Sequence, residues 1–329
     1  MTEFYKKNSD GTITCLLCKH YCKIKEGKVG ACGVNMNREG RLHNLVYGNL
    51  AALHVDPIEK KPLYHFLPGT TALSLGTVGC NMKCPFCQNW QISQTNNIKN
   101  STRVTPQELV SAALRYKSST IAYTYNEPTI FYPFARDVAM LAKEHGLKNI
   151  FVTNGIMSDE VIEDMKGLID ACNVDYKSNN EEYYKKVLKS PFVVKENLVK
   201  LKKAGIWIEV TTLVVPGVND SREELAEMAK FIASELGEDT PWHVNAFHPD
   251  YKMKDTPPTS PVQLLVAEEE ARKAGLKYVY VGNLGLENVT YCPKCGAELI
   301  KRHGYYIVSN IIENGHCPYC KIKIEGIWQ

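Results

Sequence analysis

Cysteine is the feature that most constrains this chain, because eleven of its twelve cysteines lie in three tight clusters. The clusters comprise Cys15, Cys18, Cys22 and Cys32; Cys80, Cys84 and Cys87; and Cys292, Cys295, Cys317 and Cys320. The polar start of the chain, MTEFYKKNSDG, lacks the apolar segment of a secretory signal, so we expect a cytoplasmic protein. In a reducing compartment, clustered cysteines bind metals or carry out redox chemistry more often than they form disulfides. The sequence therefore predicts a metal-bearing protein, with the isolated Cys172 as a core residue.

Composition narrows the class of protein. Hydrophobic residues make up 44% of the chain, which is too much for a disordered protein. No apolar run reaches the ~20 residues that a membrane helix needs. The net charge of +3 is too balanced to indicate binding to nucleic acid or to a membrane. A nucleic-acid-binding protein built on the last cysteine cluster is an alternative, but the nearby basic segments KRHG and KIK are short.

The alternation of apolar runs with amphipathic segments predicts an α/β fold from about residue 72 onward. The expected strands are residues 72–78, 120–124, 149–153, 171–176, 207–215, 243–247 and 278–281. The expected helices are residues 106–117, 131–145, 158–168, 221–236 and 262–274. Repeated βα units favour a barrel or partial barrel, and an open doubly wound sheet is the alternative. Residues 1–70 read as strands and turns around the first cysteine cluster.

The central cluster has the spacing C-x3-C-x2-C directly after the first strand of the α/β region. Three thiolates can hold one soft metal centre, but they are one ligand short of a closed structural zinc site. A four-iron cluster held by three cysteines would leave one iron open to a substrate or cofactor. Loops at the C-terminal ends of barrel strands are where such folds carry catalysis. The alternatives are a zinc loop with a distant fourth ligand and a simple iron–sulfur electron carrier, which would not need an α/β barrel.

This spacing, with Phe86 just before the last cysteine, resembles the signature of the radical S-adenosylmethionine (SAM) enzymes. The segment GTVGCNMKCPFCQNW is similar to the pyruvate formate-lyase activating-enzyme branch of that superfamily. Six further segments resemble, in order, the radical SAM enzyme of the AmmeMemoRadiSam system: CLLCKHYCKIKEGKVGACGV, DPIEKKPLYHFLPG, YTYNEPTIF, VTNG, PGVND and HPDYKM. The resemblance covers most of residues 15–285.

The resemblance implies a partial (β/α)6-type barrel over residues 71–285 and a [4Fe–4S] cluster on Cys80, Cys84 and Cys87. SAM would chelate the fourth iron, next to Phe86, and its reductive cleavage would give a 5′-deoxyadenosyl radical that abstracts hydrogen from an unknown protein or small molecule. Such an enzyme would be oxygen-sensitive and would need an external donor of the flavodoxin or ferredoxin type. A glycyl-radical-enzyme activase is the alternative function. AMMECR-like and Memo-like proteins are the implied partners.

The resemblance further implies that polar residues at the ends of strands bind SAM. Residues 125–128, Tyr-Asn-Glu-Pro, lie where the superfamily has Gly-Gly-Glu-Pro, so Asn126 takes the place of the second glycine. Glu127 would accept hydrogen bonds from the methionyl ammonium. An ordinary turn is the alternative. Thr153 and Asn154 precede a glycine at the end of the next strand and would contact SAM, although Asn-Gly is also a plain turn signal.

Three candidates lie further along the chain. Asp175 and Lys177 fall on one face of a strand, and Asp-x-Lys is similar to the activating-enzyme pattern that places the SAM carboxylate and ribose. A structural ion pair is the alternative. The resemblance assigns His248 to the ribose, whereas a lone histidine is more often structural.

The two flanking clusters have metal-ligand spacings. The paired C-x2-C motifs of the tail, residues 286–329, predict a zinc ribbon, with a rubredoxin-like iron site as the alternative. The four cysteines of the N-terminal region could close a zinc site or hold an auxiliary iron–sulfur cluster. His20 could replace one of these cysteines, and unmetallated reactive thiols are a third possibility.

Overall fold

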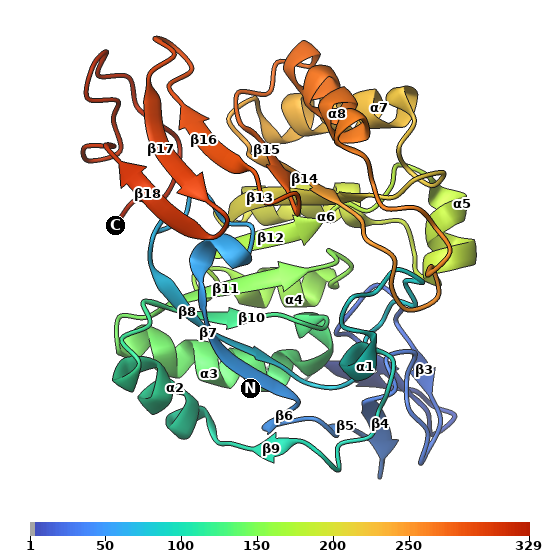
Figure 1. Cartoon of the computed structure of the whole chain (residues 1–329). Coiled ribbons are helices and arrows are strands. Elements are labelled where there is room, and N and C mark those ends of the chain that lie inside the picture. The colour runs from blue at the N-terminus through green and yellow to red at the C-terminus, as the bar shows by residue number, and fades with distance from the viewer. Residues whose placement is uncertain (1–3) are drawn as a thin grey trace. The chain divides into compact units, whose positions relative to one another are not determined.

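The computed structural model describes residues 4–329, which divide into two compact units (Figure 1). The first unit comprises the chain up to Asp56 together with Thr71–Cys172 and Asn180–Ile206. The second comprises Pro57–Thr70, Asn173–Asn179 and Trp207–Gln329. The predicted division into residues 1–70, 71–285 and 286–329 remains a prediction, and its first three residues lie outside the described chain.

The strands and helices alternate through most of the chain. The strands are β1 Tyr5–Lys7, β2 Ile13–Cys15, β3 Lys23–Ile24, β4 Asn35–Arg38, β5 Arg41–Asn44, β6 Asn49–Leu50, β7 Ala52–Pro57, β8 Thr71–Gly76, β9 Thr102–Arg103, β10 Thr120–Tyr123, β11 Lys148–Thr153, β12 Ala171–Asp175, β13 Trp207–Val214, β14 Trp242–Ala246, β15 Val279–Gly282, β16 Glu287–Tyr291, β17 Glu298–His303 and β18 Tyr306–Asn310. The α-helices are α1 Trp90–Ser93, α2 Pro106–Arg115, α3 Tyr132–Glu144, α4 Asp159–Met165, α5 Glu181–Tyr183, α6 Val194–Lys203, α7 Arg222–Phe231 and α8 Pro261–Lys273. Four short helical turns are η1 Ile58–Lys60, η2 Pro128–Phe131, η3 Tyr184–Leu188 and η4 Ile232–Leu236.

Parallel strands form the centre of the first unit. β10 pairs in parallel with β8 and β11, so that Ala122 lies opposite both Ser74 and Ile150. Every residue of β10 is buried, as a parallel strand covered on both faces requires. The helices α2 and α3 pack together and cover these strands (Figure 1). The parallel α/β arrangement that the sequence predicts is confirmed here.

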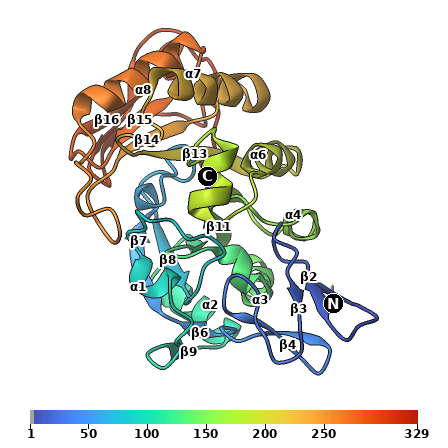
Figure 2. The same ribbon diagram turned by 90° about the vertical axis from the view of Figure 1, so that its right-hand side faces the viewer.

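The N-terminal part of the first unit is built from short antiparallel strands (Figure 2). β2 pairs with both β1 and β3, and β4 pairs with β5. The β4–β5 turn contains Glu39 at φ +56° and Gly40 at φ +67°, which are the left-handed angles of a tight hairpin turn. The expectation of strands and turns in this region is therefore confirmed.

The second unit repeats the parallel pattern and ends in an antiparallel sheet. β14 pairs in parallel with β13 and β15, and α8 packs on both β14 and β15 beside α7 (Figure 2). The tail forms the antiparallel sheet β16–β17–β18. Its core contains Leu299, Ile300 and Ile324, which pack with Tyr64 from the early segment Pro57–Thr70. The boundary between the units falls within β12, and closure of the strands into a partial barrel remains a prediction.

Several elements differ from the sequence expectation, among them the short helices α1 and α5, which were not predicted. Helix α6 was not predicted, although Val194, Leu198 and Leu201 form a buried helical stripe. The regular part of α7 ends at Phe231, and a wider π-helical turn continues to Leu236. None of the helices in residues 4–329 is long and apolar enough to cross a membrane.

Candidate active site and metal centres

The three central cysteines lie on the loop that leaves β8 and leads to α1. Cys84 is buried, and Cys80 and Cys87 are partly exposed. The backbone N–H of Met82 donates to the Sγ of Cys80 at 3.5 Å, and the Sγ of Cys87 lies 3.1 Å from the Oγ of Ser93. Burial raises the pKa of the Cys80 thiol. The loop thus presents three neighbouring cysteines, none of them in a disulfide, at the end of a buried strand.

Asn126 fixes the start of this loop. Its Oδ1 accepts from the backbone N–H of Thr77 at 3.0 Å, and its Nδ2 donates to the carbonyl of Gly79 at 2.8 Å. The preceding residue, Tyr125, has a φ of +68°, which is the left-handed region that favours glycine. Tyr125 adopts this left-handed backbone although it is not a glycine. Its hydroxyl donates to Asp56 at 2.6 Å.

Glu127 joins the ends of β10 and β11. Its Oε1 accepts from the backbone N–H of Thr129 at 3.0 Å and from the hydroxyl of Thr153 at 2.8 Å. Its Oε2 accepts from the backbone N–H of Asn154 at 2.7 Å. Burial raises the pKa of this carboxyl, and the hydrogen bonds oppose that shift. Both carboxylate oxygens therefore accept hydrogen bonds from N–H and O–H groups of this chain. Through these bonds Glu127 positions the ends of β10 and β11.

Asn81 ties the cysteine loop to two other segments. Its Oδ1 accepts from the Nδ2 of Asn154 at 2.8 Å, and its backbone carbonyl lies 2.8 Å from the Nε2 of His20. Sequence reasoning missed Asn81, although its place between the first two cysteines of the motif could have marked it. The predicted residues Cys80, Asn126, Glu127, Thr153 and Asn154 are thus brought into one hydrogen-bonded set of loops.

The other predicted SAM ligands lie in the second unit. Lys177 lies beyond the end of β12, and its Nζ is 2.8 Å from Asp175 Oδ2, which is the ion pair given as the alternative in the sequence analysis. The carbonyl of Lys177 accepts from the Nδ2 of Asn219 at 2.7 Å. His248 follows β14 and is exposed. The SAM-binding roles of these three residues stay predictions.

Comparisons with known proteins decide the family. The profile of the Radical SAM superfamily matches residues 74–232, which contain the cysteine loop and its anchors. The chain is 44% identical over 328 residues to uncharacterized protein MJ0808 of Methanocaldococcus jannaschii, with 98% of each chain covered. The chain belongs to the radical SAM superfamily. It is also 24% identical over 218 residues to the pyruvate formate-lyase-activating enzyme of Clostridium pasteurianum, covering 61% of this chain and 87% of that enzyme.

A solved structure shares the fold of this radical SAM protein. SuiB of Streptococcus suis bound to S-adenosylmethionine superposes with a TM-score of 0.52 at 12% identity, over 69% of this chain and 52% of SuiB. The superfamily implies a [4Fe–4S] cluster and SAM, and relates this chain to glycyl-radical-enzyme activases. The narrower assignment to the AmmeMemoRadiSam system stays a prediction.

Sulfur geometry shows which kind of centre each cysteine set fits. Among residues 4–329, only Cys292, Cys295, Cys317 and Cys320 form a group of three or more ligand side chains whose ligand atoms all lie within 4.8 Å of one another. A single zinc with Zn–S bonds of ~2.3 Å in a tetrahedron needs sulfurs about 3.8 Å apart. The Sγ atoms of Cys292 and Cys320 are 3.5 Å apart, and those of Cys295 and Cys317 are 3.7 Å apart. The tail therefore carries a site with the dimensions of a mononuclear centre held by four thiolates.

The radical SAM loop has a different geometry. Its three thiols fall outside that 4.8 Å limit, as expected of a cluster in which each cysteine binds a separate iron. The donor set of three cysteines on one short loop, with a fourth coordination position left open, fits the [4Fe–4S] cluster that the superfamily implies. Cys80, Cys84 and Cys87 are the residues that would hold it.

The N-terminal cysteines form a third set. Cys15 and Cys18 are buried, and Cys22 and Cys32 are partly exposed. Burial, together with the neighbouring charges of Cys32 and Cys22, raises the pKa of Cys15 to about 12. Burial likewise raises the pKa of Cys18, with smaller contributions from the charges of Cys15 and Cys32. His20, which could have replaced one of them, is instead directed at Asn81.

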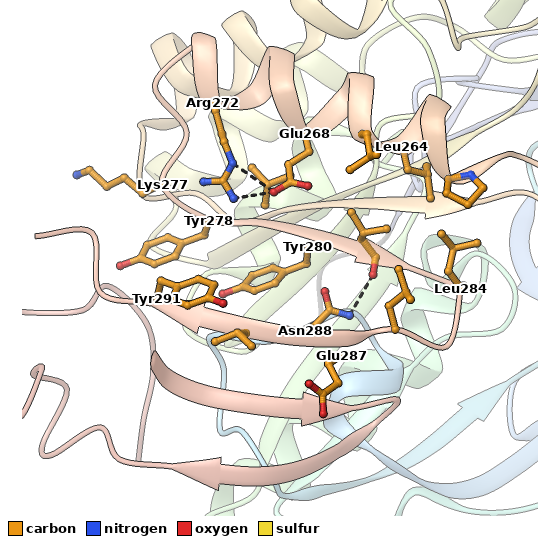
Figure 3. A pocket seen from close by; sticks show the side chains of 16 residues that line it. Leu264, Glu268, Arg272, Lys277, Tyr278, Tyr280, Leu284, Glu287, Asn288 and Tyr291 are labelled. Atoms are coloured by element: carbon orange, nitrogen blue, oxygen red, sulfur yellow. Dashed lines mark hydrogen bonds and ion pairs between the residues drawn. The ribbon is translucent and has the colours of Figure 1, made fainter. Parts of the chain in front are cut away.

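The second unit contains a cavity of about 360 Å³ between α8, β15 and β16 (Figure 3). Leu264, Tyr280 and Tyr291 give it an apolar lining, and Arg272 pairs with Glu268 at its rim. The side chain of Asn288 in β16 donates to the carbonyl of Val281 in β15 at 3.0 Å, which joins two lining strands. None of the predicted SAM ligands lines this cavity.

A buried polar cluster lies in the second unit around Glu209. Its carboxylate accepts from the backbone N–H groups of Tyr64 and His65 at 2.9 and 2.8 Å, and His243 Nε2 lies 2.7 Å away. The Nδ1 of His65 donates to the carbonyl of Glu325 at 2.7 Å, because a carbonyl can only accept. The Nε2 of His65 then accepts from the hydroxyl of Tyr280 at 2.6 Å. This cluster fixes the segment Pro57–Thr70 between the parallel strands and the tail of the same unit.

Proposed function

We propose that this protein is an enzyme that cleaves SAM reductively at a [4Fe–4S] cluster held by Cys80, Cys84 and Cys87. When bound and reduced by an external donor, the cluster would supply one electron to the sulfonium of SAM, and breakage of the 5′-carbon–sulfur bond would give methionine and a 5′-deoxyadenosyl radical that abstracts hydrogen from a substrate. The single observation that carries the proposal is the three-cysteine loop, which Asn126 and Asn81 tie to the ends of β10 and β11. Hydrogen bonds from two strands hold the loop in one position, as a ligand loop for a reactive centre requires.

We assign the side chains around the cysteine loop three roles: binding iron, positioning the backbone and binding SAM. The three thiolates bind iron, and the buried ring of Phe86 keeps water from the middle of the cysteine loop. Glu127 and Asn126 set the backbone of the strand ends, where Thr153 donates to Glu127 and Asn154 donates to Asn81 of the cysteine loop. Asp175, Lys177 and His248 are proposed to bind the carboxylate and ribose of SAM by charge-assisted hydrogen bonds.

The relation to the pyruvate formate-lyase activating enzymes supports a protein substrate, with a glycyl-radical-enzyme activase as the specific form of that proposal. A small-molecule substrate is the second candidate. The resemblance of the six ordered segments supports AMMECR-like and Memo-like proteins as partners. The one-electron chemistry calls for a flavodoxin- or ferredoxin-like donor.

The tail has a separate proposed role. Four sulfurs at zinc-like separations support a zinc ribbon over residues 286–329, in which the metal contributes folding energy to a small antiparallel sheet.

The proposed reaction is tested by anaerobic reconstitution with iron, sulfide and reductant, followed by addition of labelled SAM. The expected product is 5′-deoxyadenosine, and deuterium should pass into it from the substrate when deuterated candidate proteins are added. The variant Cys80→Ala/Cys84→Ala/Cys87→Ala should lose all cleavage. Cys172→Ala, which removes a buried cysteine outside the three clusters, should keep it. Cleavage that persists in the triple variant would show that the reaction does not use this loop.

A further inference from the structure

The fold of residues 13–35 brings the four N-terminal cysteines together. β2 and β3 pair antiparallel, with Thr14 opposite Lys23, so the next step of the register places Cys15 opposite Cys22. The backbone N–H of Cys15 donates to the carbonyl of Cys22 at 3.0 Å, which confirms that step. Side chains that face each other across such a pair have Cβ atoms roughly 5 Å apart. Cys18 lies in the connection between the same two strands.

The loop between β3 and β4 contributes the fourth thiol, that of Cys32, and together with Asn35 at the start of β4 it provides N–H groups that donate hydrogen bonds to sulfur. A Cβ placed on Gly30 would lie 3.3 Å from the Sγ of Cys22, so this loop passes directly over that thiol. The backbone N–H of Ala31 donates to the Sγ of Cys22 at 3.4 Å, and the Nδ2 of Asn35 donates to the Sγ of Cys32 at 3.4 Å. Hydrogen bonds to ligand sulfurs stabilise metal-bound thiolates and tune the potential of iron–sulfur centres.

The separations of these sulfurs distinguish the N-terminal set from the tail. In the described chain, no three of the N-terminal thiols have all their sulfurs within 4.8 Å of one another, whereas the four tail sulfurs meet that limit. A single zinc would need sulfurs about 3.8 Å apart. A four-iron cluster assigns each thiolate to its own iron, so its four sulfurs lie farther apart. The tail set thus has the dimensions of a mononuclear centre, and the N-terminal set does not.

The N-terminal set also lies against the radical SAM loop within the first unit. A Cβ on Gly79, next to Cys80, would lie 2.8 Å from the carbonyl oxygen of Cys32. Gly79 has a φ of +88°, and its backbone therefore approaches the second loop as only glycine can. The contact of His20 with the carbonyl of Asn81 joins the same two loops at a second point.

We propose that Cys15, Cys18, Cys22 and Cys32 ligate a second iron–sulfur cluster, of the four-iron type, beside the loop of the first. The proposal concerns four thiolates that the proposed reaction does not use. It therefore stands or fails independently of SAM cleavage.

Iron, acid-labile sulfide and zinc are counted in the full chain produced anaerobically and reconstituted. The parent should hold about eight iron and about eight sulfide per chain with about one zinc in the tail. The decisive protein is Cys80→Ala/Cys84→Ala/Cys87→Ala, in which the N-terminal cysteines are intact. It should keep about four iron, about four sulfide and a reducible brown chromophore. Loss of nearly all iron from this variant, or about two zinc per chain in the parent, would overturn the proposal.

A second pair of variants assigns the remaining iron. Adding Cys22→Ser and Cys32→Ser to the triple variant should remove the residual iron and sulfide. Adding Cys172→Ala instead should leave both unchanged. Residual iron that survives the Cys22→Ser/Cys32→Ser change would place the cluster elsewhere and contradict the assignment. The electron paramagnetic resonance spectrum of the reduced triple variant gives the cluster type without any change at the four cysteines.

Discussion

The carboxylate of Glu127 accepts the backbone N–H of Asn154 at 2.7 Å, which joins the end of β10 to the end of β11. Asn154 in turn donates its side-chain amide to Asn81 in the radical SAM loop at 2.8 Å. A buried carboxylate that serves as the common acceptor for two strand ends stabilises the whole arrangement, because each N–H it satisfies would otherwise be buried without a partner.

The first prediction concerns this carboxylate. Glu127→Ala removes the acceptor of two buried backbone N–H groups, those of Thr129 and Asn154. Each unsatisfied donor costs about 1–3 kcal/mol, so the loss of both acceptors should lower the free energy of unfolding by about 2–6 kcal/mol. Glu127→Gln keeps one oxygen acceptor and should lose less. The measurement is anaerobic thermal and denaturant unfolding.

The control for this prediction is Glu144→Ala at the exposed end of α3, which should change stability by no more than about 0.5 kcal/mol. If Glu127 served only to bind the SAM ammonium, its alanine variant would lose SAM affinity and keep the parent melting temperature. A melting temperature equal to that of the control would therefore argue against the positioning role.

The second prediction concerns the metal of the tail. Cys292→Ser/Cys295→Ser should lose about one zinc per chain, because two of the four ligands are gone. Its melting temperature should fall, since binding free energy of a structural metal is folding free energy. Elemental analysis and thermal unfolding are the measurements, with Cys172→Ala as the variant that should keep the zinc. Iron at this position in the parent would instead indicate the rubredoxin-like alternative.

The strands could be predicted well because the burial of a parallel strand is visible in the residues of that strand alone. Strands buried on both faces read as short apolar runs, and the seven predicted strands agree with the observed bounds to within two residues. Helix α6 was missed because its apolar stripe is diluted by five lysine and glutamate residues that face solvent.

The site was predictable only in part, for a different reason. The spacing of Cys80, Cys84 and Cys87 marks the ligand loop directly, since all three residues are close in sequence. The role of Glu127 depends on donors that arrive from β11, twenty-six residues away, so no local pattern contains it. The two sets of four cysteines also differ in the separations of their sulfurs, and a C-x2-C spacing, which both sets contain, does not encode those separations.

The third prediction is a dependence of stability on pH that comes from His65. Burial lowers the pKa of this imidazole to about 4, although the negative charge of nearby Glu209 opposes the shift. The unfolded chain takes up the proton near pH 6.5, and the folded chain does so only near pH 4. Between these values the unfolded state binds more protons, so stability falls as the pH falls through that window. The expected loss from this group is about 3 kcal/mol.

The contribution of His65 is isolated by comparing how steeply the free energy of unfolding depends on pH in two variants and in the parent. His65→Gln should flatten the dependence of the free energy of unfolding on pH between about 6.5 and about 4. His303→Gln, on the exposed face of β17, should keep the parent slope. Acid release of zinc acts on all three proteins alike and cancels in the comparison. Parallel curves for the His65 variant and the parent would mean that the pKa of His65 is the same in the folded and unfolded protein.

The last prediction concerns Asp175 and Lys177, whose side chains pair at 2.8 Å in the second unit. Both groups are partly buried, and removal of either breaks this ion pair. If the pair binds SAM, Asp175→Ala and Lys177→Ala should each weaken SAM binding by roughly ten- to hundredfold, the value of a charge-assisted hydrogen bond of about 1.5–3 kcal/mol. The absorbance spectrum of the radical SAM cluster should stay unchanged. A purely structural pair would lower the melting temperature and leave the affinity of the folded protein at its parent value.

The ion pair between Arg136 and Asp164, at 2.7 Å in the first unit, supplies the matched control for these variants. Asp164→Asn breaks an ion pair outside the proposed site, so it should lower the melting temperature and keep the parent affinity for SAM. Measuring both quantities on all three variants separates the two roles of the Asp175–Lys177 pair. Asp175 and Lys177 variants that behave like Asp164→Asn in both measurements would remove the pair from the set of SAM ligands.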